Sequence, residues 1–278
     1  MLRLRSGRRV GWTRVSHVVM SSRRASSKRA PEPAPRKDRG EVASQPDDAT
    51  LLAFFRAIAA RDLHDVSRML DSSGDWIPVP AIRVGASRQD AETYFLGAIQ
   101  HYVYAGDTGL HVAAAAYDRT TAELLVANGA QARARNRRGA EPLHYAADGI
   151  PDRAHWDPDG QREVIDYLVA TGADPDARDD SGVAALHRAV RTRCSAAVHA
   201  LLENGANPLM TNKRGSTPLH LAVQNTGRGE SGSTAAKDQQ REIINLLLQY
   251  GAQPTDTDAN GKTVEAAAAS AWIRELLT

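Results

Sequence analysis

Clusters of aliphatic residues recur along most of the chain and indicate a repeated helix. Each cluster is followed within a few residues by a Gly-Ala pair, and glycine readily takes the left-handed conformation with which helices often end. The clusters lie at Leu124-Leu125, Ile165 with Leu168, Leu201-Leu202 and Leu246 to Leu248, and the pairs begin at Gly129, Gly172, Gly205 and Gly251. The pattern therefore predicts four helices that each end at a glycine.

A second marker recurs in the same frame. Four histidines each follow a leucine and lie five residues after a glycine; they are His111, His144, His187 and His220, after Gly106, Gly139, Gly182 and Gly215. The gaps between them are 33, 43 and 33 residues. A fixed period is the signature of stacked units that bury their apolar faces against one another. We expect each unit to contain a turn, a short helix from the Leu-His pair, and the second helix described above.

The most regular copy, Gly215-Ser216-Thr217-Pro218-Leu219-His220-Leu221-Ala222, resembles the ankyrin repeat with its T-P-L-H-x-A core. The resemblance covers roughly 50–278 and implies an all-α ankyrin-repeat α-solenoid of helix-turn-helix units joined by short β-turns or hairpins. We therefore predict a disordered basic tail at 1–48 and an ankyrin-repeat domain at 49–278. The domain divides into a cap at 49–71, an insertion at 72–105, repeats at 106–138, 139–181, 182–214 and 215–260, and a C-terminal cap at 261–278.

The insertion does not fit the period. From Ser87 to Val103, apolar residues fall at i, i+3, i+4, i+7, i+8, i+11 and i+12, counted from Ala91. This spacing predicts an extra amphipathic helix. We expect its apolar stripe to pack against the first repeats, and the alternative is a helix that docks a partner.

Repeats two and four carry extra loops of 10 and 13 residues between their first and second helices. The loop at 148–162 contains Trp156, and exposed tryptophan is enriched in binding hot spots. The alternative is that Trp156 folds back over its own repeat. The loop at 227–240 is rich in Gly, Ser and Ala and is expected to be mobile.

Charge and composition narrow the range of functions that the chain could have. The net charge of +2 combines +7 in residues 1–48 with −5 in the remainder, so the repeats offer no basic face for nucleic acid. No apolar stretch approaches the roughly 18 residues that cross a bilayer. The single cysteine, Cys194, cannot form an internal disulfide, so folding does not require an oxidising compartment. We expect a monomeric, cytoplasmic protein.

The tail leaves three alternatives open. It is rich in Arg and Ser and has no acid before Glu32, which is similar to an organellar transit peptide. Residues 1–30 would then target the chain to an organelle. The tail could instead be plainly disordered, with Met20 as the true start, or an arm that contacts nucleic acid or membrane.

Little in the sequence indicates catalysis. Stacking places the four Leu-His imidazoles in a row, one per repeat, too far apart to share a metal ion. The resemblance implies instead that each imidazole hydrogen-bonds backbone and holds adjacent turns together. No Ser-His-Asp arrangement, phosphate-binding glycine loop or Cys-x-x-Cys pair is present. We expect no catalytic, cofactor or metal site and no small-molecule substrate.

The stack creates an extended concave surface from the turns and the first helices, which we call the turn face. The resemblance implies that this face, with the insertion loops, binds another protein. One alternative is an effector or adaptor whose repeats deliver the chain to a target while the tail contacts nucleic acid, and another is an enzyme whose repeats carry a catalytic segment. Candidate contacts are Arg137, Arg138, Tyr145, Trp156, Asp179, Asp180, Arg188, Lys213, Arg214 and Leu221.

Overall fold

The computed structural model describes residues 46–72, 81–87, 89–149, 151, 156–224, 232–268 and 270–278. Residues 1–45 of the predicted tail lie outside the described residues. Parts of both predicted loops also lie outside them. Among the described residues, no helix is long and apolar enough to span a membrane.

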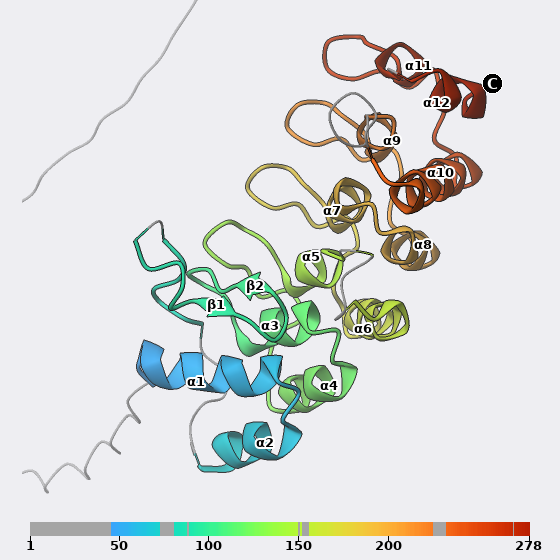
Figure 1. Cartoon of the computed structure of the whole chain (residues 1–278). Helices are drawn as coiled ribbons and strands as arrows, with labels where there is room; N and C mark the ends of the chain where they lie inside the picture. The colour runs from blue at the N-terminus through green and yellow to red at the C-terminus, as the bar shows by residue number, and fades with distance from the viewer. Residues whose placement is uncertain are drawn as a thin grey trace, which may run out of the picture. The chain divides into compact units, whose positions relative to one another are not determined.

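Paired helices stacked along one direction form the described part of the chain (Figure 1). The first helices are α3 (Gly109–Ala115), α5 (Pro142–Ala146), α7 (Ala185–Thr192), α9 (Pro218–Ala222) and α11 (Val264–Ala267). The second helices are α4 (Arg119–Ala127), α6 (Pro158–Ala170), α8 (Ser195–Glu203), α10 (Thr234–Gln249) and α12 (Ala271–Leu276). The opening pair α1 (Asp48–Ala59) and α2 (Leu63–Ser72) packs against α3 and α4. The predicted all-α repeat solenoid is confirmed.

One leucine or valine of each first helix and one aliphatic residue of each second helix form a continuous core along the stack. Each of these side chains is at most 1% exposed, and alanines fill the space between them. Burial of such a side chain stabilises the fold by about 1.5–3 kcal/mol. The core residues are Leu110, Leu143, Leu186, Leu219 and Val264 on the first helices, with Leu125, Leu168, Leu201, Leu247 and Ile273 on the second.

Each Leu-His imidazole connects two repeats, as the resemblance implied. Its Nδ1 accepts from the backbone N–H of the residue that caps its own helix, at 3.1–3.4 Å. Its Nε2 donates to a carbonyl in the next repeat, because a carbonyl can only accept. The Nε2–O distances are 3.1 Å for His111 to Ala140, 3.0 Å for His144 to Val183, 3.3 Å for His187 to Ser216 and 3.1 Å for His220 to Lys262.

The turns follow an equally strict pattern. The first turn residue is Asn or Asp, and its Oδ1 accepts the backbone N–H groups two and four residues on; these residues are Asn136, Asp179, Asn212 and Asp258. The second residue donates its N–H to the third turn position of the preceding repeat. These bonds run from Arg137 to Ala105, from Asp180 to Arg138 and from Lys213 to Ser181. Successive turns are therefore held in register at the backbone.

The prediction of a helix from Ser87 to Val103 is wrong. Two short antiparallel strands, β1 (Phe95–Leu96) and β2 (His101–Tyr102), form there, with Phe95 opposite Tyr102 and Leu96 opposite His101. Gln100 has a φ of 52°, which a helix cannot accommodate. Tertiary pairing overrides the helical spacing, because the backbone of Val103 bonds Tyr94 and Ala86 instead of its neighbours along a helix. The insertion does pack against the first repeats, through buried Leu96 and Val103.

Both predicted loops are shorter than expected, because the second helix begins early. Helix α6 starts at Pro158 and α10 at Thr234, so the C-terminal parts of 148–162 and 227–240 are helical. A buried glutamine near the start of each helix reaches back to the first helix of its repeat. Gln161 donates to the Ala146 carbonyl at 2.7 Å, and Gln240 donates to the Ala222 carbonyl at 2.5 Å.

Two glycines with positive φ offer a matched test of the turns. Gly205 (φ 85°) has open space where a Cβ would lie, whereas a Cβ on Gly215 (φ 76°) would lie 2.3 Å from the Ala259 nitrogen of the next turn. We expect Gly205→Ala to lower the free energy of unfolding by about 1 kcal/mol, from backbone strain alone. Gly215→Ala should cost about 2–4 kcal/mol, because the clash adds to the strain. Equal losses in urea unfolding would contradict the backbone contact between turns.

The imidazole bonds make stability depend on pH. Burial lowers the pKa of His144 from 6.5 to about 4, so the folded protein keeps this imidazole neutral where the unfolded chain takes up a proton. Stability is therefore lost as the pH falls from about 6.5 towards 4. Between pH 7.5 and 5.5 this residue should account for a loss of about 1 kcal/mol. The loss measured by urea unfolding should be smaller by that amount in His144→Gln; an unchanged pH dependence would refute the assignment.

Candidate partner-binding site

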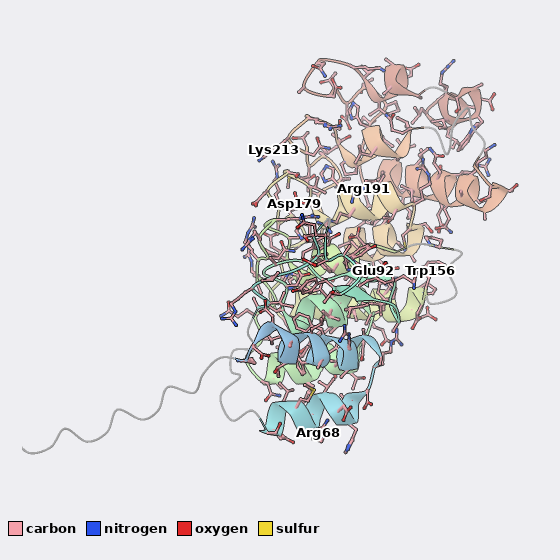
Figure 2. All side chains as sticks on the ribbon, turned by 60° about the vertical axis from the view of Figure 1, so that its left-hand side comes forward. Arg68, Glu92, Trp156, Asp179, Arg191 and Lys213 are labelled. Carbon is pink, nitrogen blue, oxygen red and sulfur yellow. The ribbon has the colours of Figure 1, made fainter. Side chains whose placement is uncertain are left out.

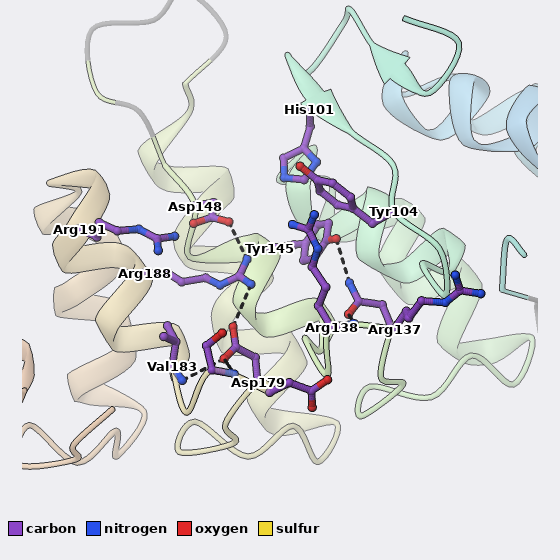
Figure 3. Close-up of a pocket in the computed structure, with 13 residues that line it drawn as sticks. His101, Tyr104, Arg137, Arg138, Tyr145, Asp148, Asp179, Val183, Arg188 and Arg191 are labelled. Atoms are coloured by element: carbon purple, nitrogen blue, oxygen red, sulfur yellow. Dashed lines mark hydrogen bonds and ion pairs between the residues drawn. The ribbon is translucent and has the colours of Figure 1, made fainter. Parts of the chain in front are cut away.

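Six of the ten predicted contact residues line one pocket on the turn face. They are Arg137, Arg138, Tyr145, Asp179, Asp180 and Arg188, and the pocket has a volume of about 610 Å³. Its walls come from β2 and the turn that follows it, from the turns that end repeats one and two, and from α5 and α7 (Figure 3). The repeats thus bring together residues that lie far apart in the sequence.

Tyr145 forms the floor of the pocket over a buried carboxylate. Its hydroxyl donates to both oxygens of Asp107, at 2.8 and 3.0 Å, and Asp107 is only 1% exposed. The Asn136 amide and the Tyr104 backbone N–H also donate to this carboxylate, at 2.9 and 2.7 Å. Burial, with the negative charge of Asp107, raises the pKa of Tyr145. The phenol is therefore fixed as a hydrogen-bond donor.

Arg188 lies beside Tyr145 and pairs with two carboxylates. Its Nη1 lies 2.9 Å from Asp148 and its Nη2 lies 3.4 Å from Asp179, and its side chain is only 14% exposed. Burial alone would lower the pKa of Arg188, but the nearby carboxylates, Asp148 above all, outweigh burial and raise it. The two ion pairs join α7 to the segment just after α5 and to the turn that ends repeat two.

An aromatic wall closes one side of the pocket. The Arg138 guanidinium lies over the Tyr104 ring, 4.0 Å from its centroid, and the His101 ring lies 4.8 Å from that of Tyr145. Figure 3 shows Arg138 rising alongside Tyr104, while Arg137 points away from Tyr145. Arg191 reaches in from the opposite side, towards Asp148.

Sequence reasoning missed several residues of this pocket. Asp148 and Arg191 stand four residues after their histidines, so the 3.6-residue helical period could have placed them beside Tyr145 and Arg188. His101 belongs to the segment wrongly predicted as a helix, and Tyr104 directly follows it. No sequence signal placed them there.

The four remaining candidates lie outside the pocket. Lys213 and Arg214 occupy the next turn, where the Lys213 ammonium donates to the Asp180 carbonyl, and Leu221 is half-buried on α9. Trp156 is half-buried against the core and donates to Gln161 at 2.9 Å. Figure 2 shows it well separated from Asp179 and Lys213. The surface around it is a shallow cavity of about 410 Å³ that also includes Ile99 and Tyr117.

Acidic and basic residues mix in the pocket without forming a metal-binding set. Across the part of the chain that the structure describes, no three His, Cys, Asp or Glu residues gather so that they could hold an ion. The arrangement can hydrogen-bond, stack and form ion pairs. Those are the means by which a protein surface recognises another molecule.

Comparison with known proteins gives the same repeat. A family model described as ankyrin repeats, in three copies, matches residues 154–258. The E3 ubiquitin-protein ligase KEG of Arabidopsis thaliana is 33% identical over 208 residues, which cover 62% of this chain and 12% of that protein. The ankyrin repeat and SOCS box protein 16 of Mus musculus is 32% identical over 150 residues, covering 53% and 31%. The B-cell lymphoma 3 protein homolog of Mus musculus is 34% identical over 146 residues, covering 52% and 28%. The chain thus spans less than a third of the length of each of these relatives.

The contribution of the Tyr145 hydroxyl to stability can be tested, because it donates to the buried Asp107 carboxylate. Tyr145→Phe removes one of its donors, and a buried acceptor that loses a partner costs about 1–3 kcal/mol. We expect urea unfolding to show a loss of that size. The half-exposed Tyr250 provides the control, and Tyr250→Phe should change stability by less than about 0.5 kcal/mol. Equal effects of the two substitutions would contradict the role given to the phenol.

Proposed function

The chain contains ankyrin repeats, and on that premise we propose that it is a non-enzymatic scaffold that binds a partner protein through the turn face. Ankyrin repeats generally mediate protein–protein interaction. The relatives above are matched over less than a third of their length, so the ligase activity in the Arabidopsis protein's name is not carried over to this chain.

The pocket that spans repeats one to three is the observation that carries this proposal. Its floor is fixed by the bonds of Tyr145 to Asp107 and by the ion pairs of Arg188. A surface held in place before binding loses little conformational freedom when a partner arrives. Its exposed rim offers charged and aromatic side chains, and Tyr and Arg are enriched in binding hot spots.

The insertion loops take a lesser part in the proposal. Trp156 packs on the core and bonds Gln161, so part of its side chain supports the fold of repeat two. Its remaining exposed surface lies apart from the pocket residue Asp179 (Figure 2). Trp156 does not line the pocket, so a partner that contacted both would have to extend beyond it.

Blocking the pocket tests the proposal. Ser181 and Arg214 occupy the same position in successive turns, and only Ser181 lines the pocket. We expect Ser181→Trp to obstruct the pocket and Arg214→Trp to leave it open. Proteins captured by the whole chain and identified by mass spectrometry should be lost with the first variant and kept with the second. Equal recovery with both variants would refute binding through the turn face at this pocket.

A further inference from the structure

We propose that the pocket on the turn face recognises an acidic side chain, Glu or Asp, in an extended segment of the partner protein. This inference rests on the proposed function and names the chemistry of its partner. It follows from the state of the charged groups around the pocket: the acidic groups already have basic partners, whereas the guanidinium groups of Arg138 and Arg191 have no carboxylate partner among the described residues.

Two arginines have guanidinium groups available to a ligand. Arg138 and Arg191 are both exposed, and within the described residues neither guanidinium has a hydrogen-bond or carboxylate partner. Figure 3 shows them entering the pocket from opposite sides, above Tyr145 and Arg188. A carboxylate between them could accept from either guanidinium, and such charge-assisted bonds are about twice as strong as neutral ones.

The acidic groups, in contrast, already have donors. Asp148 and Asp179 pair with Arg188, and Asp107 accepts from Tyr145 and Asn136. Asp180, the remaining acid of the lining, lies 3.6 Å from the Arg135 guanidinium. A basic ligand would have to displace these partners, whereas an acidic ligand finds unused donors. Charge complementarity therefore favours an acidic segment.

Two further features prepare the pocket for a carboxylate. The Tyr104 ring beneath the Arg138 guanidinium restricts its motion, so less rotamer entropy is lost on binding. The volume of about 610 Å³ has room for the main chain that carries the acidic residue as well as for its side chain.

A peptide-display selection tests this inference. Random dodecapeptides would be selected on the immobilised whole chain, and we expect enriched peptides to share Glu or Asp at one position. In fluorescence anisotropy, Glu→Gln at that position should weaken binding about ten- to hundredfold, as loss of a charge-assisted hydrogen bond predicts. Arg138→Ala and Arg191→Ala should each weaken it similarly, and the attraction should decline as salt rises.

Arg214→Ala is the matched control, because Arg214 has the turn position of Arg138 but does not line the pocket. Its affinity for the selected peptide should equal that of the unchanged protein. Enriched peptides without a shared acid, or equal binding to Arg138→Ala and Arg191→Ala, would overturn the inference, as would the absence of enrichment. If Ser181→Trp still abolished the capture of partner proteins, the proposed function would stand in each of these cases. If Ser181→Trp left the capture unchanged, both the proposed function and this inference would be refuted.

Discussion

A neutral imidazole in each repeat connects one helical hairpin to the next. One ring nitrogen accepts from the N-terminus of its own short helix, and the other donates to the carbonyl before the next helix cap. Both bonds are possible only while the ring is uncharged, since a charged imidazole has no acceptor. Burial keeps it neutral by lowering the pKa of His111, His144 and His187. The spacing of the turns, and of everything displayed on them, depends on these bonds.

The pocket uses residues that the repeat does not prescribe. The turn bonds fix where each third turn position lies, and repeat one ends with Arg138 at that position, beside Tyr104 of the preceding turn. The residue after each histidine is equally free to vary, and it supplies Tyr145 and Arg188 to the floor. A regular backbone thus holds irregular side chains in fixed positions. A solenoid can acquire a specific binding surface in this way, because the backbone spacing repeats while the exposed side chains differ from one repeat to the next.

Sequence reasoning found the pocket only in part, for local reasons. Arg137, Arg138, Asp179 and Asp180 were found because the glycine that ends each turn marks the turn in the sequence. His101 was missed because its segment has helical spacing, and Tyr104 directly follows that segment. Nothing local reveals that β2 pairs with β1 or that the turn after β2 bonds the next turn. Trp156 was proposed from the length of its loop. The bond to Gln161 that holds it against the core joins a predicted loop to a helix that begins earlier than expected.

The sequence by itself determined the repeat, the paired helices and the glycine at each turn and helix end, whereas the bridging role of the histidines was implied by the resemblance to the ankyrin repeat. The repeat and its helices follow from patterns of nearby residues that recur from one repeat to the next. Only the tertiary structure decided that Asp107 lies beneath Tyr145, that Arg188 joins two carboxylates, and that the guanidinium groups of Arg138 and Arg191 have no carboxylate partner among the described residues. Those contacts join residues in different repeats, and which side chains meet there depends on how the units stack rather than on the local order of residues.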